Sequence, residues 1–177
     1  MPTSRKSKNI CPLCRRAQSG PIKDGLCDRC VVAANTPAKC AECGKDCKKA
    51  TAKDVYPDQH YLPSFASMAN KVYWQCECGA YVGSHEKSGA PLGTAAGREL
   101  RELRSQVHKY FDRLWQHFVE KEGWQQHVAR SVLYGWLAGR LGIVPGQCHI
   151  ALFDTKTCLR AIEACQTYHF PDTPLTT

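Results

Sequence analysis

The sequence predicts a small α+β protein in which a cysteine-rich, turn-rich half precedes a mainly α-helical, three-helix domain. Two observations predict this order. Nine of the 12 cysteines lie before residue 80, most of them in closely spaced pairs. From Leu100 onward, apolar residues recur at helical spacing instead. A chain of 177 residues has room for one ordinary domain or two small ones.

The first cysteine-rich unit spans residues 10–36, after a polar and basic arm at residues 1–9. Its cysteines form two CxxC pairs separated by twelve residues: Cys11, Cys14, Cys27 and Cys30. Each CxxC makes a tight turn that can direct both sulfurs at one metal ion, and this spacing is typical of zinc sites. The segment is too small to fold without a metal. We therefore expect a four-cysteine zinc knuckle.

The second unit, residues 37–93, is predicted to form a zinc ribbon followed by a Gly/Pro/Ser-rich connector. Its predicted ligands are Cys40 and Cys43 in one turn with Cys76 and Cys78 in another. Cys47 could replace one of these ligands, although the role of a spare thiol is favoured. A site formed by Cys27 and Cys30 with Cys40 and Cys43 stays open as an alternative pairing. Strands are expected at residues 53–57, 71–75 and 80–83. The sequence thus predicts two structural zinc ions.

The cysteine usage and the termini favour a reducing, cytoplasmic setting. The N-terminus is basic and lacks the apolar run of a signal peptide. No stretch approaches the roughly 20 apolar residues of a membrane helix, so no membrane partner is expected. Paired cysteines in a reducing compartment more often bind metal than form disulfides. The oligomeric state is not indicated.

The helical domain is expected over residues 94–170, with a loose tail at 171–177. Thr94 would cap a helix to about Val119, a second helix would run from Gln125 to Leu141, and Asp154 would cap a third at Thr155–Thr167. In the third helix, Leu159 and Ile162 are expected to face inward. The core face of the first helix comprises Leu100, Leu103, Val107, Tyr110, Phe111, Leu114 and Phe118. A third metal site at Cys148, His149, Cys158 and Cys165 is conceivable, but buried thiols are favoured.

The formal net charge of +8 is concentrated near the N-terminus, where residues 1–50 carry 11 Lys/Arg against 4 Asp/Glu. Two four-cysteine zinc sites would lower the total to about +4, because each contributes a net −2. Such a charge favours a nucleic-acid partner, although a solubilising tail gives the same count. The predicted phosphate contacts are Arg5, Lys6, Lys8, Arg15, Arg16, Lys23, Arg29, Lys45, Lys48, Lys49, Arg101 and Arg104.

One pair of residues in the helical domain suggests catalysis. His108 and Asp112 are four apart and therefore share a helical face, with Arg104 one turn earlier. A general base beside an arginine could serve a metal-dependent nuclease. A structural role for this pair is favoured, because polar pairs at this spacing are common and no known nuclease motif is present. We predict no catalytic residues.

A series of short motifs continues from the second cysteine pair into the helices: Cys76-x-Cys78-Gly-Ala-Tyr81-Val82-Gly83-x-His85, Pro91-Leu92-Gly93-Thr94, Glu99-Leu-Arg101-x-x-Arg104, His108-x-x-Phe111-Asp112-x-Leu-Trp115, Tyr134-x-Trp136-Leu137-Ala138 and Cys148-His149-Ile150. By these motifs, residues 40–165 resemble a zinc-finger-containing domain family found mostly in phages and prophages. The resemblance implies a metal-binding fold rather than an activity, and the first four-cysteine unit would be an addition to the family core. A phage origin would imply host-directed roles.

Three functional hypotheses follow from these observations. The leading one is non-catalytic, zinc-stabilised binding of nucleic acid, with phosphate contacts in the basic first fifty residues. The second is a phage effector that binds and inhibits a host protein in the host cytoplasm, and the third is the nuclease built on His108 and Asp112.

Overall fold

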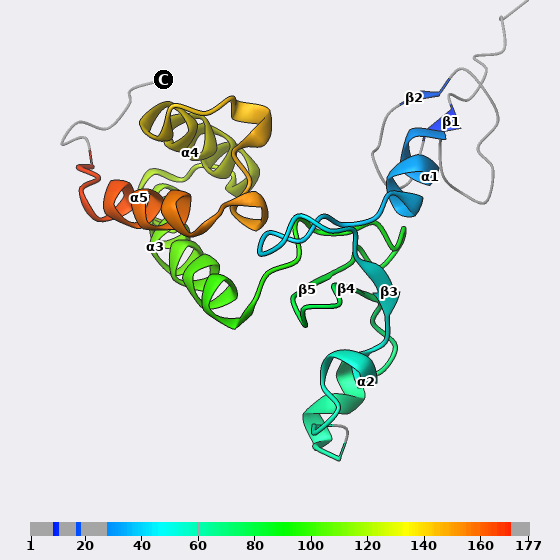
Figure 1. Cartoon of the computed structure of the whole chain (residues 1–177). Helices are drawn as coiled ribbons and strands as arrows, with labels where there is room; N and C mark the ends of the chain where they lie inside the picture. Colours follow the sequence, from blue (N-terminus) through cyan, green and yellow to red (C-terminus); the bar gives the residue numbers. More distant parts are fainter. Residues whose placement is uncertain (1–8, 11–16, 19–27, 60, 171–177) are drawn as a thin grey trace, which may run out of the picture. The chain divides into compact units, whose positions relative to one another are not determined.

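The computed structural model of the chain describes residues 9–10, 17–18, 28–59 and 61–170, and the chain divides into two compact units after Ala95 (Figure 1). In the first unit, β1 (Asn9–Ile10) pairs antiparallel with β2 (Ala17–Gln18), and α1 spans Asp28–Asn35. The ribbon sheet and two short helices make up the rest of the described part of this unit.

The ribbon is a three-stranded antiparallel sheet in the order β3-β4-β5, made of β3 (Lys48–Ala50), β4 (Tyr73–Gln75) and β5 (Tyr81–Gly83). Lys49, Trp74 and Val82 lie opposite one another across the three strands. The central residue, Trp74, is 4% exposed, and its indole N–H donates to the carbonyl oxygen of Gly89 at 2.9 Å. This bond ties the connector to the sheet.

The prediction of a strand at residues 53–57 is wrong. This segment begins with a short helix, α2 (Ala52–Val55), and the first strand of the sheet lies before it. Thr51 and Asp54 form a capping box, in which the Thr51 amide donates to the Asp54 carboxylate at 2.7 Å and the Asp54 amide donates to the Thr51 hydroxyl at 3.4 Å. The reciprocal cap satisfies backbone groups of the helical turn and fixes its start.

Beyond α2, a 3-10 helix, η1 (Pro63–Ser67), buries Phe65 in a small aromatic core. There Tyr56, Tyr73 and Tyr81 meet edge to face, with ring centroids 5.4 to 6.0 Å apart. Tyr73 and Tyr81 therefore pack within the ribbon unit, whereas Tyr61 is 74% exposed.

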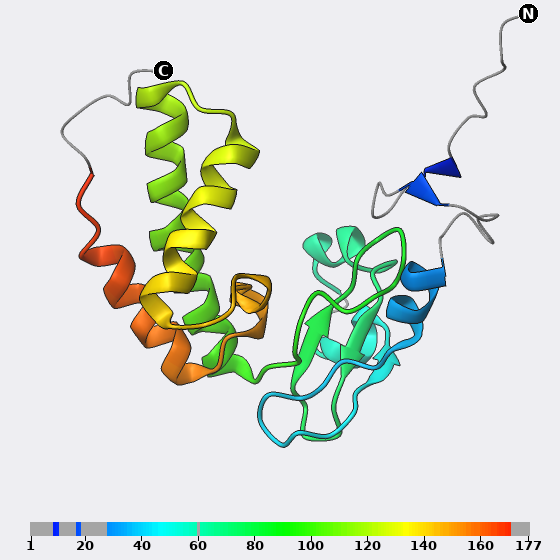
Figure 2. The same ribbon diagram turned by 90° about the horizontal axis from the view of Figure 1, so that it is seen from above.

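Residues 96–170 of the second unit contain three α-helices: α3 (Arg98–Glu122), α4 (Gln126–Leu141) and α5 (Thr155–Gln166). Two short 3-10 helices, η2 (Pro145–Gln147) and η3 (Ile150–Leu152), connect α4 to α5. Figure 2 shows α4 returning alongside α3, with α5 packed across the first half of α3. Gly123 and Gly142 end α3 and α4 with positive φ angles of 68°, a conformation that favours glycine.

The start of α3 differs from the prediction, because Gly97 and not Thr94 occupies the N-cap. Ala95 is extended and bonds to the ribbon: its amide donates to Lys39 and its carbonyl accepts from Ala41, at 2.9 and 2.8 Å. A helix that began at Thr94 would lose these bonds. The predicted cap of α5 is confirmed, since the Asp154 carboxylate accepts from the Thr157 amide at 2.7 Å.

The core of the second unit is built from the buried faces of the three helices and η3. The predicted face of α3 is confirmed, with Val107 and Phe111 fully buried at its centre. The inward orientation expected for Leu159 is wrong, because this side chain is 54% exposed. Small side chains face the core instead: Cys158, Ala161, Ala164 and Cys165. Cys148, Cys158 and Cys165 are buried thiols, as favoured. No helix in the described ranges is both long and apolar enough to span a bilayer.

Candidate metal centre

Four cysteines of the ribbon unit converge on one point. The Sγ atoms of Cys40, Cys43, Cys76 and Cys78 all lie within 4.8 Å of one another. The Cys40 and Cys78 sulfurs are 3.6 Å apart, and the Cys43 and Cys76 sulfurs are 3.5 Å apart. The predicted second ligand set is therefore brought together, although its two cysteine pairs are more than thirty residues apart in the sequence.

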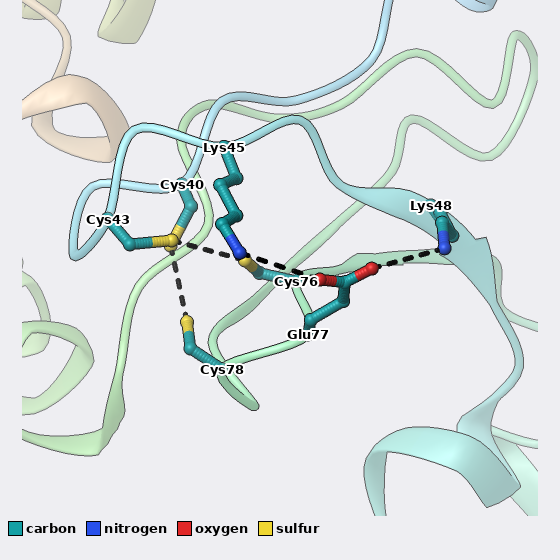
Figure 3. Close-up of polar contacts among 7 residues, drawn as sticks. All are labelled: Cys40, Cys43, Lys45, Lys48, Cys76, Glu77 and Cys78. Carbon is teal, nitrogen blue, oxygen red and sulfur yellow. Dashed lines mark hydrogen bonds and ion pairs between the residues drawn. The ribbon is translucent and has the colours of Figure 1, made fainter.

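Each cysteine pair lies in a tight turn that closes on a glycine. The Gly44 amide donates to the Cys40 carbonyl and the Gly79 amide donates to the Cys76 carbonyl, both at 2.9 Å. Both glycines have positive φ, 74° and 86°, a region that residues with a Cβ rarely adopt. The two turns face each other (Figure 3), so the two sulfur pairs point into the same space.

This arrangement fits zinc. A tetrahedral site with Zn–S bonds of about 2.3 Å places its sulfurs about 3.8 Å apart, close to the separations found here. The backbone N–H of Cys78 donates to the Cys76 sulfur, and this bond, with neighbouring thiols, lowers the pKa of Cys76 to about 7. A lowered pKa favours the thiolate, which is the form that binds metal. Bound zinc would cross-link the two turns and stabilise the folded ribbon.

A fifth cysteine, Cys47, lies beside the site but outside the ligand group. It is 3% exposed, and its amide donates to the Ala38 carbonyl at 2.8 Å. Burial and the neighbouring thiols raise its pKa to about 12, which favours a neutral thiol. The geometry agrees with the expected role of Cys47 as a spare thiol.

Glu77 lies between the two cysteines of the second turn and points away from the sulfurs towards two lysines (Figure 3). Its carboxylate oxygens are 3.3 Å from the Lys48 Nζ and 3.6 Å from the Lys45 Nζ. These lysines lower the pKa of Glu77, with the Lys48 hydrogen bond the largest cause. Because all three side chains are exposed, the pairs contribute little to stability. The single Glu77 carboxylate offsets one of the two positive charges of these predicted phosphate contacts.

The other predicted metal ligands, Cys11, Cys14 and Cys27, lie outside the described residues, as does the side chain of Cys30 in α1. The same holds for six of the predicted phosphate contacts, Arg5, Lys6, Lys8, Arg15, Arg16 and Lys23, and for the side chain of Arg29. The first zinc knuckle and the basic arm therefore stay predictions.

The two predicted phosphate contacts in α3 lie in different environments. Arg101 is half-buried, and its guanidinium donates to the Ala96 carbonyl at 2.6 Å. Arg104 is only 8% exposed, and its Nε donates to the Phe153 carbonyl at 2.9 Å. A side chain so buried is not available to a phosphate group at the surface. This burial corrects the placement of Arg104 among the surface contacts, and we remove it from the proposed set.

His108 and Asp112 lie four apart on α3 and share a face of this helix, as predicted. One Asp112 oxygen accepts from the Trp115 indole at 2.7 Å. Among the described residues, only the four ribbon cysteines form a group of three or more potential metal ligands. The nuclease hypothesis stays a prediction, and no described side chain completes a metal centre around this pair.

A cavity of about 700 Å³ opens in the ribbon unit between residues 67–73 and 83–92. Its lining combines Tyr73 and Leu92 with Lys71, His85 and Glu86. This volume is within the usual range of small-molecule sites. The sequence does not reveal this cavity, because its two walls are brought together by long-range contacts, among them the bond from the Ser84 hydroxyl to the Val72 carbonyl at 2.7 Å.

The fold and the site define a class: a small α+β metal-binding protein with a four-cysteine ribbon and a helical unit. Comparison with known families agrees, because the profile of a zinc-finger-containing domain matches residues 36–168. The chain belongs to this family. The family match and the cysteine cluster together indicate zinc binding. No curated protein matches the chain, and no solved structure matches it.

Proposed function

We propose that this chain is a zinc-stabilised, non-catalytic nucleic-acid-binding protein whose phosphate contacts lie mainly in the first thirty residues. The distribution of charge is the observation that supports this. Residues 1–30 contain 7 Lys/Arg against 2 Asp/Glu, whereas residues 31–95 contain 7 against 6. A zinc-bound four-cysteine site would subtract two charges from each segment. Only the first segment then remains basic, and clustered basic charge favours phosphate.

The contacts of the ribbon lysines support the same division. Lys39 pairs with Asp46 at 2.8 Å, while Lys45 and Lys48 share Glu77. Lys49 is not a member of these pairs and lies over the Trp74 ring, 5.4 Å from its centroid. We therefore retain Lys49 and Arg101 as secondary contacts, and we expect the paired lysines to contribute little.

The test is fluorescence anisotropy of the full chain with short single- and double-stranded DNA and RNA. Binding should weaken steeply between about 50 and 200 mM salt, because phosphate contacts release counterions. A variant with Arg15, Arg16, Lys23 and Arg29 replaced by glutamine should bind more weakly and lose up to about four units of the logarithmic salt slope.

The matched control replaces the ion-paired lysines instead, as Lys39→Gln, Lys45→Gln and Lys48→Gln in one chain. This control should retain most of the affinity and most of the salt slope. Absence of binding to every nucleic acid at low salt would refute the proposal. Equal losses in both variants would refute the assignment of the contacts to the first thirty residues.

A protein partner is the second candidate, and one surface of the helical unit favours it. Val128 and Val132 on α4 are 40% and 50% exposed, and Gly135 and Gly139 continue the same face with open space around them. An exposed apolar stripe of this kind suits a helix of another protein. Such an interface would depend much less on salt than phosphate binding does.

The biological setting is proposed from the family resemblance alone. We infer that the chain is phage-encoded and acts in the host cytoplasm, on nucleic acid or, in the second candidate, by inhibiting a host protein of the transcription or defence machinery. Recovery of tagged chain from infected cells, with nuclease treatment before elution, would distinguish a nucleic-acid partner from a host protein.

A further inference from the structure

A group of polar and aromatic side chains lies on the helical unit where α3 and α4 pack together. Its members come from three parts of the unit: α3, α4 and the residue before η3. They are His108, Asp112, Trp115, Arg130, Tyr134 and His149. We call this group the Arg130 cluster.

The guanidinium of Arg130 is held by aromatic side chains. Its central carbon lies 5.7 Å from the centroid of the Trp115 ring, and its charge acts on the neighbouring Tyr134 hydroxyl, where it opposes the rise in pKa that burial causes. The Trp115 ring is itself fixed by its bond to Asp112. Tyr134 packs against the fully buried Phe111, with ring centroids 4.5 Å apart. Arg130 is therefore oriented before any ligand arrives.

No acidic side chain of the described residues lies at ion-pair distance from Arg130. Within the part of the chain that the structure describes, none of the ion pairs within 4 Å includes it. Asp112 lies in the same cluster, but one of its oxygens is already engaged by the Trp115 indole. An arginine has five N–H donors in a planar fork, and stacking on an aromatic ring leaves the edge of that fork accessible.

Two imidazoles add donors beside this guanidinium. The His149 ring stacks on Tyr134 with centroids 6.2 Å apart and an interplanar angle of 30°. His108 interacts electrostatically with both Arg130 and His149. Both histidines have exposed surface. A planar carboxylate can be satisfied by the arginine fork alone, whereas a tetrahedral phosphate has further oxygens for the imidazoles.

We propose that the Arg130 cluster is a phosphate-binding site, with the arginine as its bidentate donor and the two imidazoles as lateral donors. The ligand is the phosphate group of a nucleotide or of a nucleic-acid strand. This site is separate from the contacts proposed for residues 1–30. The two proposals can be tested independently, because every residue of the Arg130 cluster belongs to the helical unit.

The test is an NMR titration of the full-length, zinc-loaded chain with inorganic phosphate at constant ionic strength. The Trp115 indole N–H and the His108 and His149 ring resonances should shift together and saturate. Arg130→Gln should weaken this binding by about tenfold or more, the loss expected for a charged hydrogen-bonded pair. Arg130→Lys should also weaken it, because lysine keeps the charge and loses the planar fork.

The matched control is Arg113→Gln, which removes an exposed arginine from α3 without touching the cluster. Its phosphate affinity should equal that of the parent chain. Unchanged methyl resonances of Val107 and Leu133 would show that each variant keeps the core. Absence of a saturable shift, or equal affinity in Arg130→Gln, would overturn the proposal.

Two further titrations identify the source of the phosphate. A nucleoside monophosphate that binds more tightly than inorganic phosphate would support a nucleotide ligand. A short oligonucleotide that shifts the same three resonances would support a strand, and this shift should persist when Arg15, Arg16, Lys23 and Arg29 are replaced. Shifts confined to other resonances with all three probes would overturn the proposal.

Discussion

Arg104 and Phe153 are joined across the helical unit, where the arginine Nε donates to the phenylalanine carbonyl oxygen at 2.9 Å. The two residues are 49 positions apart, and both are buried. The bond satisfies a carbonyl at the end of η3, just before Asp154 caps α5. Arg104 therefore links α3 to the segment that positions α5.

Replacement of Arg104 by alanine should destabilise the helical unit by about 2 kcal/mol, because a buried carbonyl would lose a charged donor. Chemical denaturation of the full chain, followed by a probe in α5, measures this change. The exposed Arg113→Ala should alter the free energy of unfolding by less than about 0.5 kcal/mol. Equal stability of Arg104→Ala and the parent chain would contradict the assigned role.

Zinc content should report the ligand assignment directly. The parent chain should bind about two zinc ions per molecule, and Cys76→Ser should bind about one, since a four-cysteine site does not hold its metal with a ligand removed. Cys47→Ala should still bind about two, because its sulfur lies outside the ligand group. Metal analysis by mass spectrometry measures all three, and loss of an ion in Cys47→Ala would make that residue a ligand.

The ionisation of His108 should respond to its two charged neighbours in opposite directions. Partial desolvation, the largest cause, lowers the pKa of His108 below 6.5, while Asp112 raises it and Arg130 and His149 lower it. Asp112→Asn should therefore lower this pKa further, and Arg130→Gln should raise it. An NMR pH titration of the His108 ring measures both shifts, and shifts of the same sign would contradict the geometry of the cluster.

The same pKa shift has a consequence for stability. Because the folded pKa lies below the unfolded value, the unfolded chain binds more protons below about pH 6.5. The contribution of His108 to stability should be present above that pH and should be lost as pH falls towards the folded pKa. A His108→Gln variant should show a flatter decline of stability over this range, and an equally steep decline would show that other groups dominate.

Much of the metal site could be predicted from the sequence, because its ligands lie in two short turns with their own glycines. Cys40 and Cys43 precede Gly44, and Cys78 precedes Gly79. Such turns are local, so their spacing identifies them without knowledge of the fold. The ends of α3 and α4 at Gly123 and Gly142, and the Asp154 cap of α5, are local signals of the same kind.

The errors occurred where long-range contacts decided the outcome. Arg104 lies at the edge of the apolar face of α3, and its bond to the distant Phe153 carbonyl goes with its burial. Thr94 resembles an N-cap, yet the bonds of Ala95 to residues 39 and 41 keep the chain extended until Gly97. The error at α2 has a local cause instead: Thr51 and Asp54 form a capping box three residues apart, whereas Val55 and Tyr56 are residue types that favour strands.

We infer that the ribbon depends on zinc for its fold, whereas the helical unit has a core sufficient for its own stability. Hydrogen exchange of the full chain, measured by mass spectrometry before and after removal of zinc with a chelator, tests this most directly. The amides of residues 37–93 should lose their protection without zinc, while those of α3, α4 and α5 should keep it. Full protection of residues 37–93 in the zinc-free chain would contradict the claim.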